Sequence, residues 1–301
     1  MIEKQSQELQ VRVRFFAPPP DLRRYFTTFY YMEFNGDAAS PVVDYMHPEW
    51  ANLRFFSDNA PHAEAIDGSQ VLGATYNATG PSSRTVRFTL APPTRMWGVG
   101  LLPLGWAKFI GLDAGDLADA VVDGLAHPAF ASFAPLAHNL FGPVPDIDTE
   151  YAAIAQHFLD RDPTPLPDEA RIIAIHRALI DHEVHTVTDL VEQAGVNQRT
   201  LERISHRVFG FSPKLLLRRQ RFLRSVAHFV TGPEHRWIES LDSQYHDQSQ
   251  FVRDFKMFMG MTPRKYAALD KPILGAFMFA RAQLAGHPVQ GLDPPHGGGK
   301  V

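Results

Sequence analysis

Two stretches of the chain place similar polar side chains at the same helical spacing. Residues 197–213 read NQRTLERISHRVFGFSP, and residues 247–263 read DQSQFVRDFKMFMGMTP. At an offset of 50 residues, Arg203 matches Arg253, and a glycine and a proline coincide near the end of each stretch. Arginine can pair bidentately with guanine and glutamine with adenine, glutamate can accept from cytosine, and valine can contact the thymine methyl group. These residue types therefore suit the reading of base edges in a DNA major groove.

The candidate DNA-contacting side chains lie on the outer face that each stretch would have as a helix. They are Arg199, Glu202, Arg203, Arg207 and Lys214 in the first copy, and Gln248, Ser249, Val252, Arg253 and Lys256 in the second. Many protein–DNA hydrogen bonds go to phosphate, so base contact and phosphate contact both stay open for the arginines. For Lys214 and its neighbours Arg218 and Arg221, a solvated helix face explains the charge almost as well as a grip on phosphate.

Local signals predict the helices that would position these residues. Asn197 can cap a helix whose inner face is Leu201, Ile204, Val208 and Phe209, and Gly210 ends it. A shorter apolar stripe over 187–194 predicts a helix before it, and Ser212-Pro213 predicts the start of a long basic helix that runs to about residue 230. In the second copy, Phe251, Phe255 and Phe258 face inward, and a helix is expected over 237–244 before it. Two helices joined by a short turn that contains glycine form a helix-turn-helix unit, and the chain carries the pattern twice.

The charge of the chain is divided unevenly along its length. The whole chain has a formal net charge of −4, yet residues 196–236 contain nine Arg or Lys and only two Glu. A basic block inside an acidic chain favours a polyanionic partner for that block, although a solvated helix face is an equally ordinary explanation of charge alone.

The first 105 residues have the composition of β-strands. Short segments rich in Val, Phe, Tyr and Thr, such as VRVRFF and YFTTFYYMEF, are separated by proline and glycine turns. Such spacing predicts an antiparallel sandwich or barrel. We therefore expect an α+β protein with four parts: a β sensory or dimerisation domain over 1–125, a helical connector and proline-rich linker over 126–167, an all-α domain with two helix-turn-helix units over 168–268, and a helix with a disordered tail over 269–301, the tail beginning at 286.

The second copy carries the signature on which a family resemblance depends. Residues Asp247-Gln248-Ser249, Phe251, Arg253, Phe255-Lys256, Gly260, Thr262-Pro263 and Tyr266, with RTLER at 199–203, resemble the DNA-binding region of AraC-type transcriptional regulators. The resemblance implies a sequence-specific regulator, activator or repressor, with a cupin-like N-terminal domain that senses a small molecule or forms a homodimer. It implies double-stranded promoter DNA and RNA polymerase as partners. Gln244 stands where the family usually has glycine before the aromatic residue of the second turn, so the alternative is a ligand-binding or dimerising cupin-like protein with a degenerate DNA-binding module.

The composition argues against several other classes. The chain has no cysteine, which excludes disulfides, thiolate zinc sites and cysteine nucleophiles. No apolar run is long enough to span a membrane, and the first residues lack a secretory pattern, so a cytoplasmic, nucleoid-associated protein is expected. We expect no catalytic residue, no metal and no cofactor. Asp44, His47 and Glu49 are close in sequence, as are His182 and His185, and they keep a metal-dependent cupin enzyme as a third hypothesis; a structural role for both groups is favoured.

Overall fold

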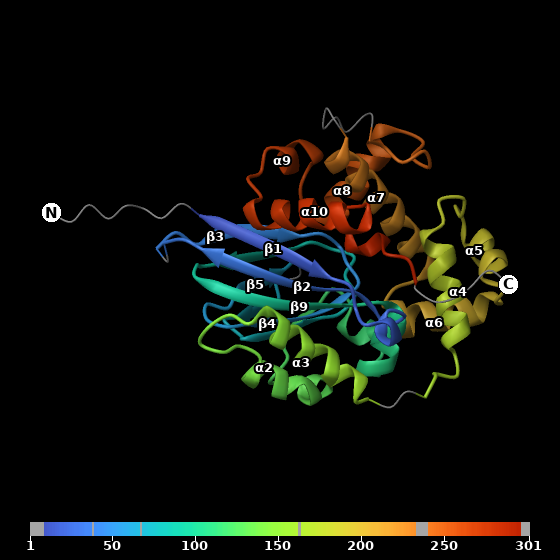
Figure 1. Cartoon of the computed structure of the whole chain (residues 1–301). Helices are drawn as coiled ribbons and strands as arrows, with labels where there is room; N and C mark the ends of the chain where they lie inside the picture. Colours follow the sequence, from blue (N-terminus) through green and yellow to red (C-terminus); the bar gives the residue numbers. More distant parts are fainter. Residues whose placement is uncertain (1–8, 38, 67, 162–163, 233–239, 296–301) are drawn as a thin grey trace.

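The computed structural model describes residues 9–295, except for 38, 67, 162–163 and 233–239. Its N-terminal part is built from two antiparallel sheets, and its C-terminal part is helical (Figure 1). This confirms the expected α+β class. No helix of the described residues is long and apolar enough to cross a membrane.

The larger sheet has six strands in the order β1-β2-β9-β4-β7-β10, and the smaller sheet has four in the order β3-β8-β5-β6. The strands are β1 (Gln10–Phe16), β2 (Phe26–Asn35), β3 (Val42–Met46), β4 (Ala51–Phe56), β5 (His62–Ala65), β6 (Gln70–Leu72), β7 (Tyr76–Thr79), β8 (Val86–Leu90), β9 (Thr94–Leu101) and β10 (Val121–Asp123). The segments expected to be strands form strands, because they are rich in β-branched and aromatic residues, which pack well on a pleated surface. Strand β10 was not expected, because it lies beyond residue 105, where the strand-like composition ends.

The helices cover one side of the larger sheet and form the C-terminal part. They are α1 (Pro103–Gly105), α2 (Ala134–Asn139), α3 (Ile147–Leu159), α4 (Glu169–Ile180), α5 (Val187–Ala194), α6 (Gln198–Phe209), α7 (Pro213–Thr231), α8 (Gln248–Met259), α9 (Pro263–Ala267) and α10 (Pro272–Ala285). Short helical turns complete the set: η1 (Pro20–Leu22), η2 (Trp106–Ile110), η3 (Ala114–Leu117), η4 (Pro128–Phe133) and η5 (Gln290–Leu292).

The two repeated units fold by the same local rules. Asn197 caps α6 by accepting from the backbone N–H of Thr200, and Asp247 caps α8 by accepting from that of Gln250. Each helix ends at a left-handed glycine, Gly210 with φ 81° and Gly260 with φ 66°, a conformation that glycine adopts without steric cost. The inner-face residues Leu201, Ile204, Phe251, Phe255 and Phe258 are all buried, as predicted.

The turn before α8 differs from the expectation. Residues 240–244 are not helical, and residues 233–239, which include the start of the helix expected over 237–244, lie outside the described part of the chain. Asp242 explains the difference, because its carboxylate accepts from the backbone N–H of Gln244 and thereby forms a local turn. Gln244 does not adopt positive φ, and its side chain donates to the backbone oxygen of His182. Gln244, at the position where the family usually has glycine, is therefore not in the left-handed conformation that would strain a residue with a side chain.

The end of the chain returns to the β domain. The prediction of a disordered tail from 286 is wrong for residues 286–295, although 296–301 lie outside the described residues. Val289 and Gln290 are buried, and Arg281 of α10 pairs with Asp293 at 2.9 and 2.7 Å. Helix α10 lies against β1 and β3 (Figure 1), and Asp44 accepts from the backbone N–H groups of Ile273 and Leu274 at its first turn. The contacts of α10 with β1, β3 and Asp44 join segments that lie more than 200 residues apart in the chain. Such contacts explain why this segment is ordered although its composition does not predict order.

Candidate nucleic-acid interface and ligand cavity

The predicted DNA-contacting side chains all lie on the outer faces of α6, α7 and α8. Val252 is half-buried; the others are exposed, namely Arg199, Glu202, Arg203, Arg207, Lys214, Gln248, Ser249, Arg253 and Lys256. Their exposure is what contact with a large polyanion requires. Their roles at DNA stay predictions.

Asp168, the residue before α4, forms ion pairs with two arginines of α6. Helix α6 is the second helix of the first helix-turn-helix unit and so its recognition helix. Its Oδ2 atom accepts from Arg203 at 3.3 Å and from Arg207 at 2.6 Å, and its Oδ1 atom accepts from Arg171 at 2.9 Å. Burial raises the pKa of Asp168, but the hydrogen bonds from Arg207, Arg171 and Arg203 outweigh burial and leave the pKa below its ordinary value. The ionised carboxylate therefore orients both guanidinium groups on the outer face of α6.

A second buried carboxylate joins the connecting helix to the second unit. Asp254 of α8 is 1% exposed and accepts from Arg218 at 2.6 Å, from Arg221 at 3.2 Å and from the Tyr245 hydroxyl at 3.0 Å. Arg218 and Arg221 therefore connect α7 to α8 through ion pairs with a buried carboxylate, so their charges are not merely those of a solvated helix face. Lys214 remains exposed.

Both recognition helices end against the β domain. At the end of α6, a Cβ atom on Gly210 would lie 3.2 Å from the backbone oxygen of Ala114, and His206 Nδ1 lies 3.4 Å from Asp113 Oδ1. At the end of α8, the backbone oxygen of Phe258 accepts from the N–H of Thr85 at 2.7 Å. The β domain thus fixes the position of each unit at the corresponding end.

Arg219 provides a third connection, midway along α7. Its guanidinium group is fully buried, lies 4.0 Å from the centre of the Trp50 ring and donates to the backbone oxygens of Ser82 and Glu49 at 2.8 and 3.4 Å. Burial lowers the pKa of Arg219 to about 9, although the Asp119 carboxylate raises it. A planar cation stacked on an aromatic ring gives directional attraction, so α7 is held at a defined place beside Trp50, the residue before β4.

A cavity of about 130 Å³ lies beside this connection, inside the β domain. Both sheets line it, and so do α10 and the segment after it. Its apolar wall includes Phe15, Met32, Phe88, Met96, Ile273 and Phe277. The cavity therefore contacts both the β domain and the C-terminal end of the chain, which continues directly from the second helix-turn-helix unit.

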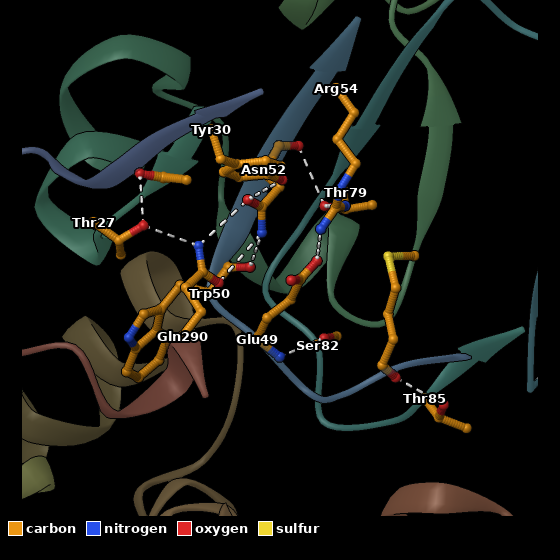
Figure 2. Close-up of polar contacts among 12 residues, drawn as sticks. Thr27, Tyr30, Glu49, Trp50, Asn52, Arg54, Thr79, Ser82, Thr85 and Gln290 are labelled. Carbon is orange, nitrogen blue, oxygen red and sulfur yellow. Dashed lines mark hydrogen bonds and ion pairs between the residues drawn. The ribbon is translucent and has the colours of Figure 1, made fainter. Parts of the chain in front are cut away.

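The polar wall of the cavity is a connected hydrogen-bond network (Figure 2). Arg54 donates to Glu49 at 2.5 Å and to Thr79 at 3.3 Å, and the Tyr30 hydroxyl donates to Asn52 at 3.0 Å. Gln290 from the C-terminal segment bonds to Asn52 and Thr27 at 3.3 and 3.2 Å. Because the backbone oxygen of Glu49 accepts from Arg219, one residue touches both the cavity and the connecting helix.

His47 joins the cavity wall to the end of the second unit. Its Nε2 atom lies 2.7 Å from the hydroxyl of Tyr266 in α9. Burial lowers the pKa of His47 to about 4, with a smaller contribution from the charge of Lys271. His47 is therefore neutral at physiological pH and acts as a hydrogen-bonding partner.

The residues that kept a metal site under consideration have other partners. Asp44 binds the first turn of α10, His47 binds Tyr266, and Glu49 pairs with Arg54. Within the described residues, no group of three or more His, Asp or Glu side chains could hold a metal ion. His182 pairs with Glu183 at 2.9 Å on the exposed surface.

Residues 190–268 match the family model described as a helix-turn-helix domain. This region is an AraC-type helix-turn-helix domain. The chain is thus a DNA-binding transcriptional regulator. The match covers α6, α7, α8 and α9, and these elements carry every candidate DNA-contacting residue.

Solved structures give more distant similarities. ToxT from Vibrio cholerae O395 is 10% identical with a TM-score of 0.38, over 86% of this chain and 96% of that chain. ToxT bound to (E)-4-(8-methylnaphthalen-1-yl)but-3-enoic acid is 11% identical with a TM-score of 0.41, over 86% and 98%. The AraC-like transcriptional activator CuxR is 14% identical with a TM-score of 0.29, over 72% and 87%. A comparison with curated protein sequences gives no match. Values this low transfer no residue role or ligand to the present chain.

The cavity residues and the connections of Asp168 and Arg219 were not predicted. The sequence carries no local signal for them, since each depends on a partner far away in the chain. Only the unusual density of arginine in α7 marks that helix as one that needs acidic or aromatic partners.

Proposed function

We propose that the chain is a sequence-specific regulator whose two recognition helices, α6 and α8, read adjacent major grooves, and that a small molecule in the β-domain cavity alters this binding. One observation carries the proposal: the outer faces of α6 and α8 present the predicted base-reading residues to solvent, while the same two helices end against the β domain.

Binding would begin with electrostatic attraction between phosphate and the basic outer surface. Arg199 and Lys214 contribute exposed charge, and salt would weaken this step steeply because each neutralised phosphate releases counterions. Arg203, oriented by Asp168, would then pair with a base edge. The candidates on α8 would read the neighbouring groove, about 34 Å away along B-DNA.

Ligand response would follow from the contacts that cavity-wall residues make with the helical part of the chain and with the C-terminal segment. A ligand that contacts Glu49, Gln290 or His47 acts on residues that also bind Arg219, the C-terminal segment or Tyr266. A ligand shifts a conformational equilibrium only by its differential affinity for the two states. The cavity suits this role because its wall belongs to both parts of the chain.

The proposed partners are double-stranded promoter DNA, an effector in the cavity, RNA polymerase and a second copy of the chain. β1 forms one edge of the six-stranded sheet, and an edge strand offers backbone groups for pairing with another copy. A regulator of promoters acts in the cytoplasm, at the nucleoid. We propose no catalytic role.

Fluorescence anisotropy with DNA from upstream of the protein's own gene tests the proposal, with random duplex as competitor and a salt series. We expect tight binding that resists the competitor. Arg203→Ala should cost about 1–3 kcal/mol of specific binding free energy and leave binding to random DNA much less affected. Arg87→Ala, at an exposed position of β8 away from the recognition helices, is the matched control. Equal affinity for both DNAs in the wild type would favour the alternative, a ligand-binding or dimerising protein with a degenerate DNA module.

A further inference from the structure

The walls of the cavity favour an apolar, ring-sized body. Phe15, Tyr30 and Phe277 pack near one another, with ring centres 5.4–6.0 Å apart in tilted or edge-on pairs, and Met32 and Met96 complete the wall. Aromatic and thioether side chains make favourable contacts with another ring. At about 130 Å³, the cavity is close to the size of an apolar cavity of about 150 Å³ that binds benzene.

The charged groups in the wall already have partners. Arg54 pairs with Glu49 at 2.5 Å, and Arg281 pairs with Asp293 at 2.9 and 2.7 Å and also donates to Thr28 at 3.1 Å (Figure 2 shows the Arg54 pair). A ligand carboxylate would have to displace Glu49 or Asp293, which would leave a buried charge without its partner. Such a loss costs several kcal/mol. The electrostatics of the wall therefore favour an uncharged ligand.

One polar atom in the wall lacks a partner. Asn77 of β7 is 3% exposed, lines the cavity and pairs in strand register with Arg54, so both side chains lie on the inner face of the sheet. Among the described residues, Asn77 Oδ1 has no hydrogen-bond partner. A buried acceptor without a donor costs about 1–3 kcal/mol, and a ligand hydroxyl would satisfy it.

We propose that the cavity binds an uncharged, largely apolar ring compound whose hydroxyl group donates a hydrogen bond to Asn77 Oδ1. The inference rests on the proposed role of the cavity as the effector site. It adds the chemical class of the ligand, and it sets neutral alcohols and phenols apart from carboxylates and from pure hydrocarbons.

Three probes with one body and different polar groups test the inference: 4-ethylphenol, ethylbenzene and 4-ethylbenzoate, titrated into the full chain by isothermal titration calorimetry at pH 7.5. We expect 4-ethylphenol to bind about tenfold more tightly than ethylbenzene, in line with one hydrogen bond to a buried acceptor. 4-Ethylbenzoate should bind most weakly. Benzoate binding as tight as that of the phenol would overturn the inference, and so would the absence of measurable binding by all three probes.

Asn77→Leu tests the acceptor directly, because leucine keeps the branched shape and the number of non-hydrogen atoms and removes the hydrogen-bond acceptor. We expect the preference for 4-ethylphenol over ethylbenzene to disappear in this variant and to persist in Asn139→Leu, a control on the exposed surface of α2. A preference unchanged by Asn77→Leu would contradict the assignment. If Asn77→Leu does not fold, the relative affinities of the wild type for the three probes still test the proposal.

The DNA assay separates this inference from the proposed function. If the chain binds its promoter specifically but none of the probes, the ligand class is wrong and the regulator stands. If 4-ethylphenol binds with the expected preference but promoter affinity is the same with and without it, the ligand class stands and the proposed response fails.

Discussion

At the scale of single residues, the buried side chain of His47 connects the cavity wall to Tyr266 at the end of the second unit. Its imidazole is neutral and bonded to Tyr266, and its pKa is lowered from an ordinary value near 6.5 to about 4. The unfolded chain therefore binds a proton at His47 between these values, whereas the folded chain does not. Folding stability from this group is complete above pH 6.5 and is lost as the pH falls towards 4.

The resulting prediction concerns stability against pH. Lowering the pH from 7.5 to 5 should reduce the free energy of unfolding of the wild type by about 2 kcal/mol through His47 alone. Glutamine can still hydrogen-bond to Tyr266 but does not titrate. Over the same pH range, the free energy of unfolding of His47→Gln should therefore fall by about 2 kcal/mol less than that of the wild type. Urea unfolding at the two pH values measures the difference, with His138→Gln on the surface as control. Parallel pH profiles for the wild type and His47→Gln would rule out this role.

At the scale of elements, the start of α10 depends on one carboxylate. Asp44 of β3 is fully buried and accepts from the backbone N–H groups of Ile273 and Leu274 at 2.9 and 2.8 Å. Burial raises the pKa of Asp44, while these hydrogen bonds from the chain lower it. Asp44 thus satisfies the free N–H groups at the helix start, where a negative charge is also favourable.

Asp44→Ala should lower the free energy of unfolding by about 2–3 kcal/mol, because two buried N–H groups lose their acceptor. Asp44→Asn should cost less, since the amide oxygen can still accept. Asp58→Ala, at an exposed position between β4 and β5, should change stability by less than about 0.5 kcal/mol. Urea unfolding at pH 7.5 measures all three, and an Asp44→Ala variant as stable as Asp58→Ala would show that α10 is not held there.

The elements also show where prediction from sequence succeeds. Helices α6 and α8 could be predicted because capping residues, the end glycines and the apolar stripe all lie within 15 residues of one another. The turn before α8 could not, because Asp242 forms it together with Arg224 and Ser225 of α7. The ordered segment at 286–295 depends on Gln290 reaching Asn52, 238 residues away in the chain. Contacts at that separation leave no periodic pattern in either segment.

The candidate site likewise has one part that could be predicted from the sequence and one part that could not. The outer-face residues of both recognition helices followed from helical spacing, and all of them except the half-buried Val252 are exposed. Local sequence did not predict three other features: the ion pairs of Asp168, the contact of Arg219 with Trp50, and the cavity wall. Each joins segments that are distant in the chain and carry no unusual local pattern.

At the scale of the whole molecule, the β domain positions both reading units. Gly210 contacts the loop around Ala114, Phe258 bonds to Thr85, and Arg219 lies over Trp50 between them. The separation of α6 and α8 is therefore set jointly by α7 and by the β domain. Glu49, which lines the cavity and accepts from Arg219, is the residue through which the proposed ligand response would act on this separation.

The most direct measurement is protection of guanine N7 from dimethyl sulfate on promoter DNA, since N7 lies in the major groove. We expect two protected clusters about one helical turn, roughly 10 base pairs, apart. Arg203→Ala should remove one cluster and Arg253→Ala the other. A single cluster that survives Arg253→Ala, or even protection along the duplex, would contradict the reading of two adjacent grooves by α6 and α8.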